Sequence, residues 1–160
     1  MSRPALHRAV VALVVFALVA AGGALVFAHR HAASVEAARG EATAAAPGRV
    51  EALLSYNAQT VDEDLAAAAE GTTGSFRENF VEFGTKTVAP QSKEQGLSTR
   101  ARVVDVGFLG GTTDHAQLLL FVDQITTSVS QPAPASTSSR VRVGVDLVDG
   151  RWVVSELTPI

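Results

Sequence analysis

An uninterrupted apolar run near the amino terminus constrains this chain more than any other feature. The twenty residues from Ala9 to Ala28 include no charged or strongly polar side chain. A helix of this length spans about 30 Å, the thickness of the hydrocarbon core of a bilayer. In lipid, a helix also satisfies every backbone donor and acceptor within one short segment. The run therefore predicts a transmembrane helix at residues 9–28, preceded by a cytoplasmic tail at residues 1–8.

Two other interpretations of this run compete with the membrane anchor. A buried core helix of this length would be unusual. A cleavable signal peptide is the stronger alternative, because Val26-Phe27-Ala28 loosely fits the small-x-small cleavage pattern. Signal peptides, however, have apolar stretches of about 7–15 residues, and this run is longer. Under the anchor and the signal-peptide interpretations alike, the rest of the chain is exported.

The charges that flank the run give only a weak indication of its orientation. Arg3 and Arg8 precede it, whereas Arg30 and Arg39 follow it, so the positive-inside bias is small by count. A short leading tail and a large carboxy-terminal domain nevertheless favour a cytoplasmic amino terminus. We therefore predict a single-pass protein of the plasma membrane whose main domain lies outside the cytoplasm, in the cell envelope.

Composition excludes several classes of function for the part after the run. From Pro47 onward, nine Lys and Arg stand against fourteen Asp and Glu, which gives a net charge of −5. Proteins that bind nucleic acid usually carry a basic patch or are basic overall, so nucleic acid is not an expected partner. The chain has no cysteine, which excludes disulfides, a thiol nucleophile and cysteine-ligated metals.

An alanine-rich segment follows the predicted membrane helix. Residues 29–47 have a helical composition and are predicted to form a stalk or linker. Pro47-Gly48 is predicted to interrupt this helix, since Pro is accepted in the first turn of a new one. A second helical segment is expected at Arg49 to Asn57. Residues 48–160 are predicted to form the extracytoplasmic domain.

Two spacings of three residues predict further helices. Thr60 with Glu63 and Ser75 with Glu78 match the capping box, and the first should start a helix at 61–70. In the third helix, three phenylalanines recur at i, i+4 and i+7 on one face, which predicts a core-facing stripe. These are Phe76, Phe80 and Phe83.

From Leu97 the hydrophobic period changes from helical to two. Strands are predicted at Ser98 to Leu109, Ala116 to Val129, Arg140 to Val148 and Arg151 to Leu157, with a turn at 110–114 and a polar loop at Pro132 to Ser139.

The last two of these strands form the most clearly predicted hairpin. Asp149-Gly150 is the residue pair that a type I′ turn favours. This turn would place Trp152 opposite Leu147 and Val154 opposite Val145 on the core face.

The order of elements, helices first and about four antiparallel strands last, predicts an α+β fold. The helices should pack on one face of a curved antiparallel sheet. This layout is similar to the cone-shaped fold shared by nuclear transport factor and ketosteroid isomerase. Such a likeness is a fold analogy and implies no activity.

No set of residues predicts catalysis, cofactor binding or metal binding. The histidines are His7, His29, His31 and His115, and no pair has the spacing of a zinc-binding helix. A Ser-His-Asp triad would have to use His115, and there is no nucleophile-elbow motif. The Asp62-Glu63-Asp64 cluster is better explained by helix amino-terminal electrostatics than by acid–base catalysis. We therefore predict a non-enzymatic protein without cofactor or metal.

Several segments of the distal domain resemble the Mce-associated membrane proteins of actinobacteria. They are LLSY near its start, the GSFR entry to the third helix, VAPQSKEQGL, LLLFVDQITT and the terminal DGRWVVSEL. The resemblance extends from about Val50 to Leu157 and is specific through the order of its motifs. Its layout is also similar to the periplasmic domain of an assembly subunit of type IV secretion systems, a single-span scaffold.

This resemblance implies an accessory role in Mce complexes, which import lipids across the cell envelope. The expected partners are the bilayer, Mce proteins and their permease, with contacts through the edge of the last strand or the Pro132 to Ser139 loop. Self-association is left open, and the family has no established catalytic residues to carry over. The alternative is a lipid or small-ligand binding module with a pocket between helices and sheet. An apolar cavity of several hundred Å³ would favour it, whereas a core filled by the three phenylalanines and Trp152 would exclude it.

Overall fold

The computed structural model describes residues 29–30, 32–130 and 133–160. The chain divides into two compact units, Met1–Glu36 and Ala37–Ile160, and nearly all described residues belong to the second. The predicted transmembrane helix at 9–28 lies outside the described residues. Within them, no helix is both long and apolar enough to cross a bilayer.

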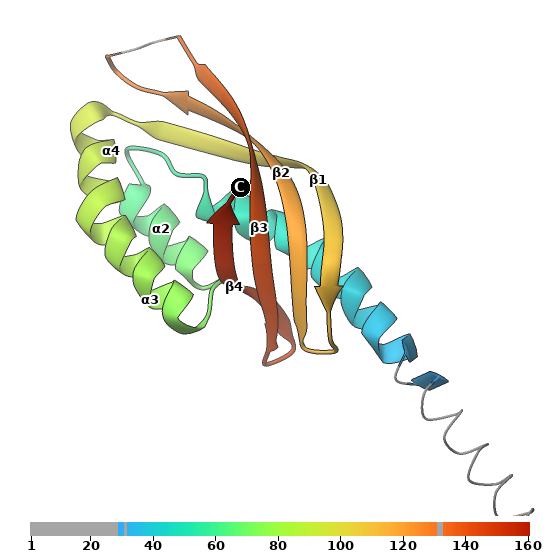
Figure 1. Cartoon of the computed structure of the whole chain (residues 1–160). Coiled ribbons are helices and arrows are strands. Elements are labelled where there is room, and N and C mark those ends of the chain that lie inside the picture. Colours follow the sequence, from blue (N-terminus) through green and yellow to red (C-terminus); the bar gives the residue numbers. More distant parts are fainter. Residues whose placement is uncertain (1–28, 31, 131–132) are drawn as a thin grey trace, which may run out of the picture. The chain divides into compact units, whose positions relative to one another are not determined.

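The second unit has an α+β fold in which helices pack against a four-stranded antiparallel sheet (Figure 1). Helical residues 32–53 are followed by α2 (Val61–Ala69), α3 (Gly74–Phe83), the π-helix η1 (Gly84–Val88) and α4 (Ala89–Gln95). The strands are β1 (Ser98–Gly111), β2 (His115–Thr127), β3 (Ala135–Val148) and β4 (Arg151–Pro159). Each strand pairs with the next in the order β1-β2-β3-β4. The predicted α+β class with helices packed on an antiparallel sheet is confirmed, as are the four strands in their predicted order.

The first helix continues through the position where the sequence predicted a break. Residues 32–53 are helical without interruption, so the predicted end at Pro47-Gly48 is wrong. Four buried residues recur at every fourth position, namely Ala38, Ala42, Ala46 and Val50, with Leu53 after them. Proline costs a helix interior about 3 kcal/mol, but helices in proteins are held mainly by the packing of their apolar face. The compact unit accordingly begins at Ala37 rather than at Gly48.

Polar side chains of the predicted stalk also contact the sheet. The Trp152 indole Nε1 donates a hydrogen bond to a Glu41 carboxylate oxygen at 3.3 Å. The Arg39 guanidinium carbon lies 5.2 Å from the centre of the Phe108 ring, a cation–π distance. The segment from Ala37 onward is therefore an integral part of the sheet's cover.

The β3–β4 hairpin has the predicted turn and register. Asp149 and Gly150 have φ angles of 49° and 73°, the two positive values that a type I′ turn requires. Leu147 lies opposite Trp152 and Val145 opposite Val154, as predicted. Strand β3 begins earlier than expected, because residues 135–139 pair with β2.

Neither predicted capping box forms. The N-cap residues of α2 and α3 are Thr60 and Thr73, and neither makes a side-chain cap hydrogen bond. At α2, a carboxylate oxygen of Asp64 instead accepts from the Thr60 hydroxyl at 2.8 Å and from the Asn57 backbone at 2.9 Å. A carboxylate in the first turn thus ties down the preceding loop, which is favourable near the positive end of the helix.

Segments α3, η1 and α4 follow one another without a break. Between Gly84 and Val88 the helix widens to π geometry, and the Ala89 backbone donates to the Gly84 carbonyl. Pro90 comes directly afterwards, at the start of α4. Since proline cannot donate the usual i→i−4 bond, a widened turn before it relieves the mismatch. The helical run ends at Gly96, whose φ of 60° is left-handed.

The buried alanine stripe predicts that added volume there will destabilise the domain. We expect Ala42→Leu to lower the free energy of unfolding by about 1–3 kcal/mol, because overpacking forces strain at a close-packed interface. Ala44→Leu is the matched control, since Ala44 is exposed on the same helix. The measurement is urea unfolding of the detergent-solubilised full-length chain, followed by fluorescence of Trp152, its single tryptophan. Equal unfolding curves for both variants would contradict the role of the stripe.

Candidate binding pocket

On the face of the sheet that the helices cover, the inward residues change from aliphatic to polar along the strands. On β2, the inward residues Ala116, Leu118, Leu120 and Val122 are fully or almost fully buried. The next inward positions on this strand, Gln124 and Thr126, are polar and only half-buried. Because neutral polar chains replace aliphatic ones here, the helices do not close tightly over this end of the sheet.

A pocket of about 580 Å³ lies at this end, between the helices and the sheet. Its apolar lining comes from the end of the first helix, from α2, α3 and η1, and from β4: Leu53, Leu54, Leu65, Phe76, Phe80, Phe83, Val88 and Leu157. Its polar lining is neutral and comes mostly from the strands: Tyr56, Asn79, Thr99, Gln124, Thr126 and Thr137. The volume is within the range of small-ligand sites.

Few of these polar groups are engaged elsewhere. The Thr99 and Thr126 hydroxyls lie 3.1 Å apart and hydrogen-bond to each other. Tyr56 is fixed by its backbone, which exchanges hydrogen bonds with Thr99 at 2.8 and 2.9 Å. Within the described part of the chain, the side chains of Tyr56, Gln124 and Asn79 make no hydrogen bond. Their donors and acceptors are therefore free to face a ligand.

The phenylalanine stripe lines this pocket instead of filling the core. No residue of α3 is fully buried. Phe76 and Phe80 pack against the core with ring centres 6.3 Å apart, whereas Phe83 is 60% exposed. The predicted core role is thus wrong for Phe83 and only partial for the other two. Trp152 is buried as predicted, and the cavity meets the condition that favours the ligand-binding alternative.

Among the described residues, no helix covers the opposite face of the sheet. In Figure 1 the first helix passes behind β1, β2 and β3, and no labelled helix lies in front of them. Phe121 and Ile125 of the central strand β2 are 36% and 49% exposed there. They lie directly opposite Arg140 and Arg100 on the neighbouring strands. We call the outward residues of β1–β3 the open face.

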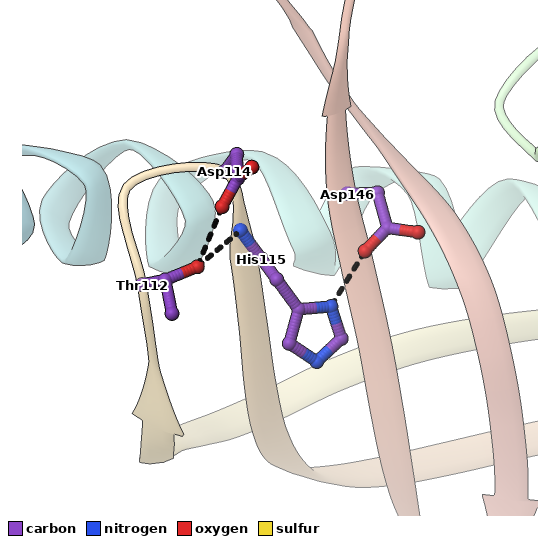
Figure 2. A network of polar contacts seen from close by, with 4 residues as sticks. All are labelled: Thr112, Asp114, His115 and Asp146. Carbon is purple, nitrogen blue, oxygen red and sulfur yellow. Dashed lines mark hydrogen bonds and ion pairs between the residues drawn. The ribbon is translucent and has the colours of Figure 1, made fainter.

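His115, the histidine that could have belonged to a catalytic triad, joins a turn network at the far end of the sheet (Figure 2). Its Nδ1 lies 2.5 Å from an Asp146 carboxylate oxygen on the adjacent strand. Its backbone N–H donates to the Thr112 hydroxyl, which in turn donates to Asp114. Among the described residues, no serine joins this network. The arrangement closes the β1–β2 turn, and within the described residues the imidazole makes no hydrogen bond to a hydroxyl group.

The Asp62-Glu63-Asp64 cluster does not form a site either. Asp62 pairs with Lys93 of α4, and Asp64 holds the loop before α2. In the described ranges, no group of three His, Cys, Asp or Glu residues is placed to hold a metal ion. His7 and His31 lie outside the described residues, and His29 is exposed.

The polar wall of the pocket was not predicted from the sequence. The signal was present in LLLFVDQITT, where every second residue faces inward and the series Leu118, Leu120, Val122 changes to Gln124 and Thr126. It was missed because an inward Gln at the end of a strand is also typical of a strand leaving the core.

Proteins of similar sequence are known from Mycobacterium tuberculosis. Uncharacterized protein Rv1362c is 40% identical over 124 residues, which are 78% of this chain and 56% of that protein. This chain therefore spans about half the length of that relative. Outer membrane protein Rv1973 is 37% identical over 123 residues, which are 77% of this chain and 76% of that protein. No model of a known protein family matches the chain.

Solved structures share the fold at low identity. An IcmL-like type IV secretion system protein from Legionella pneumophila superposes with a TM-score of 0.64 at 11% identity, over 76% of this chain and 93% of that one. CagV from Helicobacter pylori, a VirB8 homologue of a type IV secretion system, gives 0.58 at 12% identity, over 74% and 96%. At these identities the likeness establishes the fold alone.

A double-mutant cycle on His115 and Asp146 tests whether their contact is structural. Their side chains are 44% and 37% exposed. For a pair this exposed we expect a coupling energy of about 0.2–1 kcal/mol, since water screens the interaction. The measurement compares urea unfolding of His115→Ala, Asp146→Ala and the double variant with the parent chain. A coupling of several kcal/mol would contradict a simple turn-closing role.

Proposed function

The chain belongs to the family of the Mycobacterium tuberculosis protein named outer membrane protein Rv1973, and on this premise we propose that it is a non-enzymatic accessory subunit of a cell-envelope complex. It acts through protein–protein contacts of the unit Ala37–Ile160. In this proposal, residues 9–28 anchor it in the plasma membrane, with residues 1–8 in the cytoplasm and the compact unit outside. The complex is a lipid importer of the Mce type, with Mce proteins and their permease as partners.

Two independent likenesses support an accessory role. The ordered motifs from LLSY to DGRWVVSEL resemble Mce-associated membrane proteins. Solved structures with the same fold include proteins named as parts of type IV secretion systems, which are also envelope assemblies.

The observation that carries the proposal is the open face. It combines exposed apolar side chains with four exposed arginines, Arg100, Arg102, Arg140 and Arg142. No ion pair of the described part of the chain involves these arginines. On this face exposed apolar side chains alternate with charged ones, and aromatic residues and Arg are enriched in interfaces.

The strand edges are less suitable for contacts than the sequence suggested. Val154 of β4 exchanges backbone hydrogen bonds with Gly71 and Thr73, so part of the last edge is already paired. On β1, the backbone donors of Ala101 and Val103 are taken by the side chains of Ser55 and Glu51. Paired edges do not template another strand, which favours the open face.

The pocket favours a second candidate function, the binding of a small ligand between helices and sheet. The two functions are compatible because the pocket and the open face use opposite sides of the same strands.

The test is affinity purification of the full-length protein from its native membrane in mild detergent, with mass spectrometry of the co-purified proteins. We expect Mce proteins and their permease with the parent chain. Phe121→Asp should reduce their recovery at least several-fold, because it replaces an exposed aromatic side chain of the open face with a charged one. Val81→Asp is the matched control, since Val81 is 47% exposed on α3 rather than on the sheet.

Each outcome of this purification has a distinct meaning. Equal loss of partners in both variants would contradict a specific role of the open face. Recovery of other envelope proteins would keep the accessory role and reject the Mce assignment. Recovery of a second copy of the chain alone would indicate a homo-oligomer without further subunits.

A further inference from the structure

We propose that the pocket binds an uncharged amphiphile, with its hydrocarbon part against the helices and a hydroxyl, ester or carbonyl head against the strands. The class meant is a neutral lipid such as a monoacylglycerol, as distinct from a lipid with an ionised head group. This inference rests on the pocket being a binding site, the second candidate function above.

The helical side of the pocket selects a hydrocarbon. Leu54, Phe80 and Phe83 contribute apolar surface from two helices, and Leu157 contributes it from β4. Phe83, which also lines the pocket, is 60% exposed. Each buried methylene group of a ligand contributes about 0.8 kcal/mol, so an alkyl chain would gain affinity along this wall.

The charge of the lining selects a neutral head group. Among the described residues, none that lines the pocket carries a charge. An ionised head group inside it would lose hydration without gaining a partner charge, and burial of an unpaired charge is strongly unfavourable. A lipid with a phosphate or carboxylate head is therefore a poor occupant.

The strand side selects hydrogen-bonding groups. Gln124 and Thr137 lie opposite each other on β2 and β3, and Thr126 lies opposite Thr99 on β1. Together they present hydroxyl and amide groups, which can both donate and accept. A hydroxyl or ester group can hydrogen-bond to such groups without any net charge, whereas a pure hydrocarbon could not hydrogen-bond to Gln124 or Thr137.

The test compares two photoreactive lipids that differ only in charge. One is a monoacylglycerol with a diazirine in its acyl chain, and the other is its phosphate ester, lysophosphatidic acid, with the same chain. Each is added in trace amount to membranes that contain the full-length protein, and cross-linked peptides are identified by mass spectrometry. We expect the neutral lipid to label the tryptic peptides 78–86 and 152–160 at least tenfold more than the phosphate ester does.

A matched pair of variants places the same charge on either side of strand β2. Gln124→Glu introduces a carboxylate into the polar wall and should lower labelling of these peptides by the neutral lipid several-fold. Gln117→Glu introduces it on the outward side of the same strand, where Gln117 is exposed, and should leave labelling unchanged. Fluorescence of Trp152 during urea unfolding verifies that both variants are folded.

The outcomes separate the ligand class from the binding site. Equal labelling by both lipids, or labelling that Gln124→Glu does not reduce, would overturn the neutral-lipid assignment while leaving a binding site. Absence of label from both peptides with either lipid would overturn the binding site as well. Neither result depends on which proteins co-purify with the chain.

Discussion

The structure depends on covering the aliphatic side of one antiparallel sheet. Leu118 and Leu120 of β2, with Val143 of β3, have no exposed surface, so a sheet with this face in water would not be stable. The first helix provides much of the cover through a stripe of alanines, whose small side chains allow its backbone to approach the strands. This explains why the chain keeps a helix through Pro47, since a break there would separate Ala38, Ala42 and their contacts from the domain.

The pocket follows from where that cover ends. Beyond Val122 the inward positions become Gln124 and Thr126, and the first helix ends at Leu53 near this boundary. The π-helical turn after α3 also lines the pocket. It lies close to α2, because an added side-chain atom on Gly84 would lie 3.3 Å from Leu65. In the pocket, apolar side chains of the helices face neutral polar side chains of the strands. The inward residues of the strands become polar at a point where the residues of the helices are still apolar. One change in sequence composition therefore determines both the position and the polarity of the site.

Prediction from the sequence succeeded where local chemistry decides the structure, and failed where tertiary packing does. Asp149-Gly150 allows few turn types, and the strict alternation around it fixes which residues face the core, so turn and register were predictable. Alanine is equally suited to an exposed stalk and to a close-packed interface, so the burial of Ala42 could not be read from its neighbours. The capping spacing at Thr60 was equally ambiguous, because Asp64 lies one residue further and its carboxylate accepts a hydrogen bond from the Thr60 hydroxyl instead. The prediction that Phe83 lies in the core failed for a different reason. A periodic stripe shows which side of a helix is apolar but not which element packs against that side.

The edge strand β1 shows how the open face and the core are kept distinct. Its pairing with β2 shifts register at two bulges, one of which leaves Val104 unpaired. The extra residue lets Val103 and Val106 both pack against the core while Val104 is 54% exposed. A bulge also increases the local twist and makes an edge unsuitable for pairing with another chain. Since Glu51 and Ser55 already occupy two edge donors, this strand discourages edge-to-edge association. A partner that recognises the sheet must therefore contact the side chains of its open face. Such contact requires a surface of matching shape and chemistry, and this favours a specific partner over general aggregation.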